Sequence, residues 1–266
     1  MKFLGQEMRI TLKDILVVFA TFVILAVISG IIEISIGLLT GWDGKEPIDP
    51  SVLIFWVVFG TFASPIFAYV LLKLADIAKI KDYRSLAASY FVLGLLLNIL
   101  TYLSSKVMFP YLYPSPIAEI TLLVWIGNGV ITAVTLYLWL VIFGEWNMKK
   151  ISKTGGTAII SALVILLAAY AIRIPFYIGL GAIPNLITID NAIALISYFN
   201  LSFALIYNMP KKLAEFQYFF AAVFIITAII GAVLTNPNID GLLDIVHAAI
   251  ILGVIYLLST NKNLTT

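Results

Sequence analysis

The sequence predicts an all-α, polytopic integral membrane protein, on three grounds: its composition, its series of long apolar segments and the charges between them. The 266-residue chain is 62% hydrophobic and 11% charged, whereas soluble proteins carry roughly 25% charged residues. Its mean hydropathy is +1.08. A water-soluble domain of this length could not hide so much apolar surface, so the lipid bilayer must be its solvent.

Eight segments reach the length of roughly 20 residues that an apolar helix needs to cross a bilayer. In chain order we expect them at 15–40, 51–74, 86–108, 117–143, 157–182, 189–208, 214–235 and 241–260. The short basic segment 1–14 is not expected to be a signal peptide. The apolar run after it is long enough to span, and no small-residue cleavage site follows that run.

The loop charges predict the orientation. Alternate loops and the two ends of the chain hold thirteen Lys and Arg residues, whereas the remaining loops hold two, Lys45 and Lys106. Cytoplasmic loops carry the excess of positive charge, so both termini are expected in the cytoplasm of a multi-pass cell-membrane protein. The thirteen are Lys2, Arg9, Lys13, Lys73, Lys79, Lys81, Arg84, Lys149, Lys150, Lys153, Lys211, Lys212 and Lys262.

The segment 144–156 is expected to be a long inner loop that divides the spans four and four. Sliding the fourth span onto the eighth by 119 residues pairs Asn128 with His247 and Tyr137 with Tyr256. This match favours an internal duplication. We therefore predict two tandem four-helix bundles, at 1–146 and 147–266, which would be parallel repeats because each has four spans.

Four ionisable groups lie away from the ends of the predicted spans: Glu33, Arg173, Asp244 and His247, the last of which is the only histidine in the chain. At ~1.5 Å per residue, Glu33 and Arg173 lie roughly 12–14 Å below the outer ends of their spans. Asp244 and His247 lie roughly 6 and 10 Å deep, and their spacing of three residues puts them on one helical face. Charged groups in a bilayer are costly and often functional, so we expect the four to converge in its outer half.

Two interpretations of these groups stay open. In the first, Arg173 pairs with Glu33 or Asp244 to lock helices together, and His247 is a neutral imidazole bonded to Asp244 or to a backbone carbonyl. In the second, His247 ligates a haem or metal, or the group handles protons. Asn128 is open to the same two interpretations: a hydrogen bond between helices, or a ligand.

Several chemistries are excluded by what the sequence lacks. There is no cysteine, which removes thiolate metal sites and cysteine nucleophiles. One histidine cannot form a bis-imidazole haem site or an H-E-x-x-H zinc site, and there is no G-x-S-x-G, phosphate loop or Asp-rich diphosphate motif. A net charge of +2 gives no sign of direct nucleic-acid binding.

The arrangement resembles the haem A synthase family. The run 168–173, Ala-Ala-Tyr-Ala-Ile-Arg, is similar to the end of that family's fifth span. The run 225–233, together with Asp244-Ile-Val-His247, is similar to its last two spans. The resemblance implies eight helices in two tandem bundles and haem sites near the outer face. His247 would be the haem ligand. Asn128 stands where another ligand histidine would be expected, so at most one haem could bind.

Two main hypotheses for function follow. The first is a non-catalytic membrane subunit or assembly partner of an electron-transfer complex of the respiratory chain, in contact with lipid and other membrane subunits. The second is a transporter or channel component of a translocation apparatus, whose path the intramembrane charges would line. A third, an enzyme acting on lipid-linked substrates, is disfavoured by the missing motifs.

Overall fold

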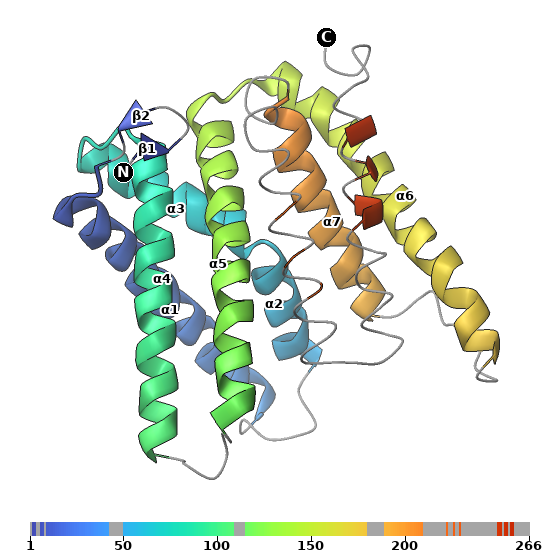
Figure 1. The fold of residues 1–266 in the computed structure, drawn as a ribbon, viewed down its shortest axis with the longest axis horizontal. Helices are drawn as coiled ribbons and strands as arrows, with labels where there is room; N and C mark the ends of the chain where they lie inside the picture. Colours follow the sequence, from blue (N-terminus) through green and yellow to red (C-terminus); the bar gives the residue numbers. More distant parts are fainter. Residues whose placement is uncertain are drawn as a thin grey trace.

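The computed structural model describes residues 2–3, 6–7, 9–42, 50–108, 115–179 and 189–209, and isolated helical residues beyond them. The all-α prediction is confirmed for these residues, apart from one short antiparallel pair of β1 (Lys2–Phe3) with β2 (Gln6–Glu7). The helices, shown in Figure 1, are α1 (Leu12–Thr40), α2 (Pro50–Thr61), α3 (Ala63–Ile77), α4 (Tyr83–Met108), α5 (Ser115–Gly144), α6 (Met148–Gly179) and α7 (Ile189–Tyr207).

Long apolar helices indicate a membrane protein. Among the described residues, three stretches are long and apolar enough to cross a bilayer: Leu12–Thr40, Tyr83–Leu100 and Met148–Pro175. The bent pair Pro50–Gly60 and Ala63–Ile77 would make a fourth. The predicted spans 214–235 and 241–260 lie outside the described residues apart from isolated helical positions, so the count of eight stays a prediction.

The second predicted span is not one straight helix, which corrects the continuous segment expected at 51–74. The chain bends by 63° between α2 and α3. The break follows Gly60, and Pro65 sits in the first turn of α3, where a missing N–H costs least. The backbone N–H of Phe62 still donates to Val58 O at 3.0 Å, so the bend leaves the end of α2 hydrogen-bonded.

The predicted inner loop 144–156 is also corrected, because most of it is helix. Helix α5 ends at Gly144 and α6 begins at Met148, nine residues before the expected start of the fifth span. Asn147 caps α6: its Oδ1 accepts from the backbone N–H of Lys150 at 3.2 Å. The cap lets the lysines of this segment lie in the first turns of α6.

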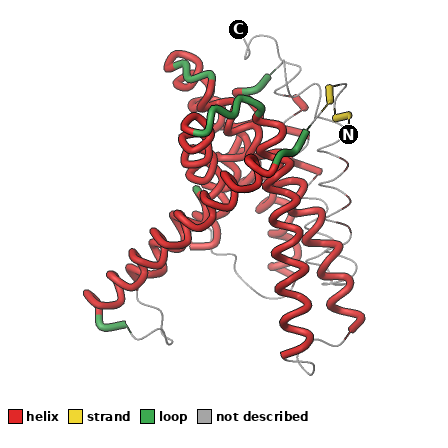
Figure 2. Tube along the Cα trace, turned by 90° about the vertical axis from the view of Figure 1, so that its left-hand side faces the viewer, coloured by secondary structure: helices red, strands yellow, loops and turns green. Residues whose placement is uncertain are grey.

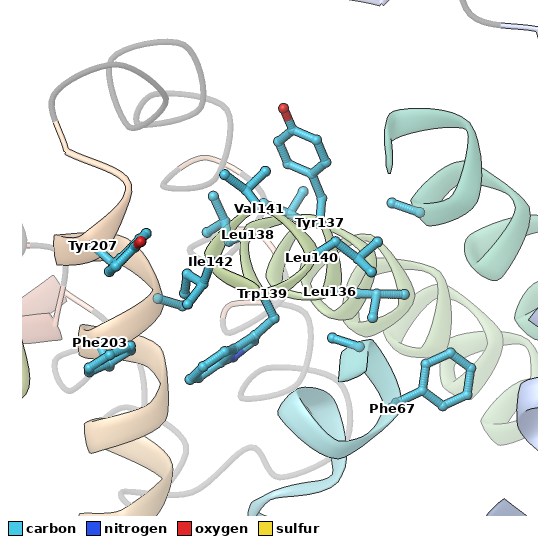
Figure 3. Close-up of a cluster of buried hydrophobic side chains, with 14 of the residues drawn as sticks. Phe67, Leu136, Tyr137, Leu138, Trp139, Leu140, Val141, Ile142, Phe203 and Tyr207 are labelled. Carbon is cyan, nitrogen blue, oxygen red and sulfur yellow. The ribbon is translucent and has the colours of Figure 1, made fainter. Parts of the chain in front are cut away.

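The core is concentrated at one end of the bundle. Residues 136–142 of α5 form seven consecutive positions that are each at most 6% exposed, as expected for a helix that is apolar on every side. Figure 3 looks nearly along α5 and shows these side chains on all sides of the helix, with Ile142 and Trp139 toward α7 and Tyr137 on another side. Trp139 stacks on Phe203 of α7, with ring centroids 5.5 Å apart and an interplanar angle of 8°.

The helices diverge toward the other end. Figure 2 shows them crossing closely in its upper part and separating below. Helix α1 starts at the packed end with a capping box between Thr11 and Asp14, and Val18 and Leu25 continue its buried face. None of its residues beyond Leu25 is buried, and Leu39 near its far end is 86% exposed.

Small side chains bring α6 and α7 together. A stripe of α6 is buried, while the opposite face exposes large apolar residues such as Ile160 and Leu167. Small residues at such spacings let helices approach closely within a membrane. Helix α7 contacts α5 and α2 as well as α6, and the predicted division into bundles at 1–146 and 147–266 stays a prediction. The buried stripe consists of Thr154, Ala158, Ser161, Ala162, Ile165 and Ala169.

Candidate functional site

The predicted polar constellation is only partly within the described structure. Asp244 and His247 lie outside the described residues. Glu33 is partly exposed on α1 and Arg173 is partly exposed on α6, whereas Asn128 lies on α5 with its side chain outside the description. Helix α1 packs mainly on α3 and α4, and α6 packs mainly on α7, so Glu33 and Arg173 belong to different helix pairs. Their convergence with Asp244 and His247 stays a prediction.

Glu33 has a structural setting that the sequence did not suggest. It lies four residues after Ser29, on the same face of α1. Ser29 lines a cavity of about 320 Å³, and Glu33 therefore lies one turn beyond that cavity. Within the described part of the chain, no three His, Cys, Asp or Glu side chains are grouped so that they could hold a metal ion.

The cavity lies where four helical segments meet. Helix α1 contributes Phe22, Leu25, Ala26 and Ser29, the α2–α3 pair contributes Phe59, Ala63, Ser64 and Phe67, α4 contributes Tyr90, and α5 contributes Thr132 and Leu136. Its volume falls at the lower end of the range of roughly 300–1,000 Å³ for small-molecule sites. Its lining is also typical of such sites, since most of the residues are apolar or aromatic and a few carry a polar group.

The bend between α2 and α3 forms one wall of this cavity. Phe59 precedes the bend, while Ala63 and Ser64 open α3 directly after it. Residues 59, 63 and 67 are spaced four apart, so they follow one helical face across the bend. The bend therefore lies at the wall of the cavity.

Three aromatic rings form a rigid group beside the cavity. Phe22 stacks on Tyr90 with ring centroids 5.4 Å apart and an angle of 13°. Phe67 meets both rings edge-on, at 4.7 Å from Phe22 and 5.1 Å from Tyr90. Such pairs add roughly 0.5–1.5 kcal/mol beyond the burial of their area, so the contacts between these rings stabilise this wall of the cavity.

The four hydroxyl groups of the lining are not equivalent. Ser29 Oγ donates to its own helix, at 3.1 Å from Ala26 O. Tyr90 and Ser64 have no hydrogen bond to another described residue. Both residues line the cavity. Among the described residues, no charged side chain lines the cavity.

A second cavity, of about 190 Å³, shares Tyr90 and Thr132 with the first. It lies between α4 and α5 and is also lined by Phe91, Gly94, Leu95, Asn98 and Gly129. A Cβ atom at Gly129 would lie 3.3 Å from the ring of Phe91, so this glycine lets α4 and α5 approach closely. Tyr90 therefore stands between two adjoining spaces.

The sequence does not point to these cavities, because its most prominent polar features are the ionisable groups within the spans. Two features of the sequence are weak indications of the cavities. Hydroxyl residues occur within apolar spans, and Gly60 and Pro65 interrupt the second span. A Gly- or Pro-interrupted apolar segment is a known indication of a binding site in membrane proteins. None of these signals tells which helices meet.

The chain was compared with known proteins in three ways. No protein-family model matches it, and neither a curated protein nor a solved structure does.

Proposed function

We propose that this chain is a non-catalytic membrane subunit or assembly partner of an electron-transfer complex of the respiratory chain. The observation that supports a subunit role is the exposed outer part of α1. Leu38 and Leu39 are 82% and 86% exposed, and no residue of α1 beyond Leu25 is buried. A helix end so little covered by its own chain offers a wide apolar face to lipid and to other membrane subunits. The resemblance to the haem A synthase family supplies the link to electron transfer.

The proposal includes the finer topology: eight spans, two tandem bundles and both termini in the cytoplasm. The antiparallel course of the described helices supports it. The start of α1, the α3–α4 connection and the α5–α6 connection lie toward the same end in Figure 1. Lys13 lies in the first turn of α1, Lys79 lies between α3 and α4, and Lys149 lies in the first turn of α6. Positive charges gather on the cytoplasmic side of membrane proteins.

Purification from native membranes tests the subunit role. A tagged chain should bring down haem- or metal-containing subunits, and the visible spectrum of the purified material should show a Soret band. Leu38→Ala with Leu39→Ala should lower the recovery of those subunits, because it shrinks the exposed face. The matched control is Ile159→Ala with Ile160→Ala on the exposed face of α6. A chain that is recovered alone, without redox subunits, would contradict the proposal.

One observation favours the alternative, a transporter or channel component. The 63° bend between α2 and α3 lies beside a cavity, and broken helices form the binding sites of many transporters. Proton flux into vesicles that contain the purified chain and a trapped pH dye tests it. Flux above that of empty vesicles, lost in Glu33→Gln, would support the alternative. Flux equal to that of empty vesicles would count against it.

A further inference from the structure

The 320 Å³ cavity is partly open. Among the residues that line it, Leu25, Phe67 and Leu136 are buried, whereas Ala26 is exposed, which indicates an open side next to Ala26. Because Ala26 lies in the middle of a span, the open side faces the hydrocarbon of the bilayer. A ligand would therefore enter from the membrane and not from water.

The chemistry of the lining restricts what can enter. A charged solute or a lipid headgroup is disfavoured, because none of the described residues that line the cavity carries a charge to pair with it. A plain acyl chain would fill the space but leave the hydroxyls of Tyr90 and Ser64 without acceptors, which costs free energy. The lining best fits a neutral, flat and largely apolar ring that carries oxygen acceptors.

We propose that this cavity binds the ring of a membrane quinone. The Tyr90 hydroxyl donates a hydrogen bond to one carbonyl oxygen of the quinone, and the Ser64 hydroxyl is a second donor. The ring packs against the group formed by Phe22, Phe67 and Tyr90, and the isoprenoid tail leaves past Ala26 into the bilayer.

The size of the cavity agrees with this ligand. A cavity of roughly 150 Å³ holds a benzene-sized molecule, so 320 Å³ accommodates a substituted or two-ring quinone head but not a whole tail. Tyr90 is held in place by Phe22 and Phe67, so its hydroxyl is directed without loss of rotamer freedom when the ligand binds.

This inference deepens the proposed function, since a quinone is the diffusible carrier that an electron-transfer complex in a membrane would use. Binding itself needs no partner subunit. The test can therefore be made on the isolated full-length chain, separately from the search for partners.

The probe is an azido-naphthoquinone, photo-activated on the purified chain in lipid nanodiscs, with unlabelled menadione as the competitor. Mass spectrometry should place the label on peptides that contain residues 22–29, 59–67 or 90, and menadione should suppress it. Tyr90→Phe keeps the ring and removes only the hydroxyl. It should weaken menadione competition about tenfold, the effect of losing one buried hydrogen bond.

Two further variants make the result specific. Ala26→Phe places a ring at the open side and should abolish the labelling. Ala171→Phe, an equal enlargement at an exposed position of α6, should leave the labelling unchanged. Circular dichroism and a monodisperse elution profile confirm that each variant is folded.

The inference is overturned if labelling is not suppressed by menadione, or if Ala26→Phe and Tyr90→Phe bind as well as the unaltered chain. It is also overturned if a photo-activatable phospholipid labels the same peptides while Tyr90→Phe changes nothing, because the occupant is then an acyl chain. Specific quinone labelling of a chain that recovers no redox subunits would uphold the inference and reject the proposed function. Recovery of redox subunits with a chain that shows no quinone labelling would uphold the proposed function and reject the inference.

Discussion

The stripe of small residues between α6 and α7 predicts a strong effect for one enlargement, Ala162→Leu. Ala162 is 1% exposed, and Ala158 and Ile165 on the same stripe are 0% exposed. The partner is α7, since a Cβ atom at Gly155 on this face of α6 would lie 4.0 Å from the ring of Phe203. Leucine adds three carbon atoms at a position that is almost fully buried.

The cost follows from overpacking, which typically destabilises a core by about 1–3 kcal/mol. Little is regained from burying the added carbons, because lipid is as apolar as leucine. We therefore expect Ala162→Leu to lower the free energy of unfolding by about 2 kcal/mol. Ala171→Leu, on the exposed part of the same helix, should change it by less than about 0.5 kcal/mol.

The assay is unfolding by SDS in mixed micelles, followed by tryptophan fluorescence; the chain has five tryptophans, and Trp139 stacks on α7. Both variants are compared with the unaltered chain at several ratios of SDS to detergent. Equal free energies for the two variants would refute the reasoning, because Ala162 would then face an adaptable environment. An Ala162→Leu chain that is more stable than the unaltered one would show instead that the interface contains a void.

Three further predictions concern the topology and the charged groups. A cysteine at Asp43 should react with an impermeant reagent from outside and one at Lys150 only after permeabilisation, and the reverse pattern would reject the orientation. If Arg173 has a buried anionic partner, Arg173→Ala leaves that partner unpaired and should lower the free energy of unfolding by roughly 3–5 kcal/mol. The control Lys149→Ala should change the free energy of unfolding only slightly. Similar SDS unfolding curves for the two variants would mean that Arg173 faces water. His247→Asn should preserve the fold but lose haem absorbance or proton-linked activity if the imidazole ligates or titrates, whereas an unaltered spectrum and activity would leave His247 a packing residue.

The sequence by itself determined the class of the protein and where most of its described helices lie along the chain. The span expected at 86–108 corresponds to α4 at Tyr83–Met108, and the one expected at 189–208 corresponds to α7 at Ile189–Tyr207. Both signals are local, because the length of an apolar run and the charges at its ends decide whether and where it crosses a bilayer. The start of α6 was misplaced because its first turns carry Lys149, Lys150 and Lys153, which are typical of a cytoplasmic loop. These turns nevertheless form a helix that Asn147 caps.

Only the tertiary structure decided which residues meet. The depth of Glu33 and of Arg173 follows from the rise per residue, but their lateral positions follow from packing, which puts α1 with α3 and α4, and α6 with α7. Tyr90 is one of thirteen tyrosines in the sequence, and nothing local distinguishes it. Its place between two cavities arises because α1, the bent α2–α3 pair, α4 and α5 converge there. A cavity is the space that several helices leave unfilled, so no single helix contains the information that specifies it.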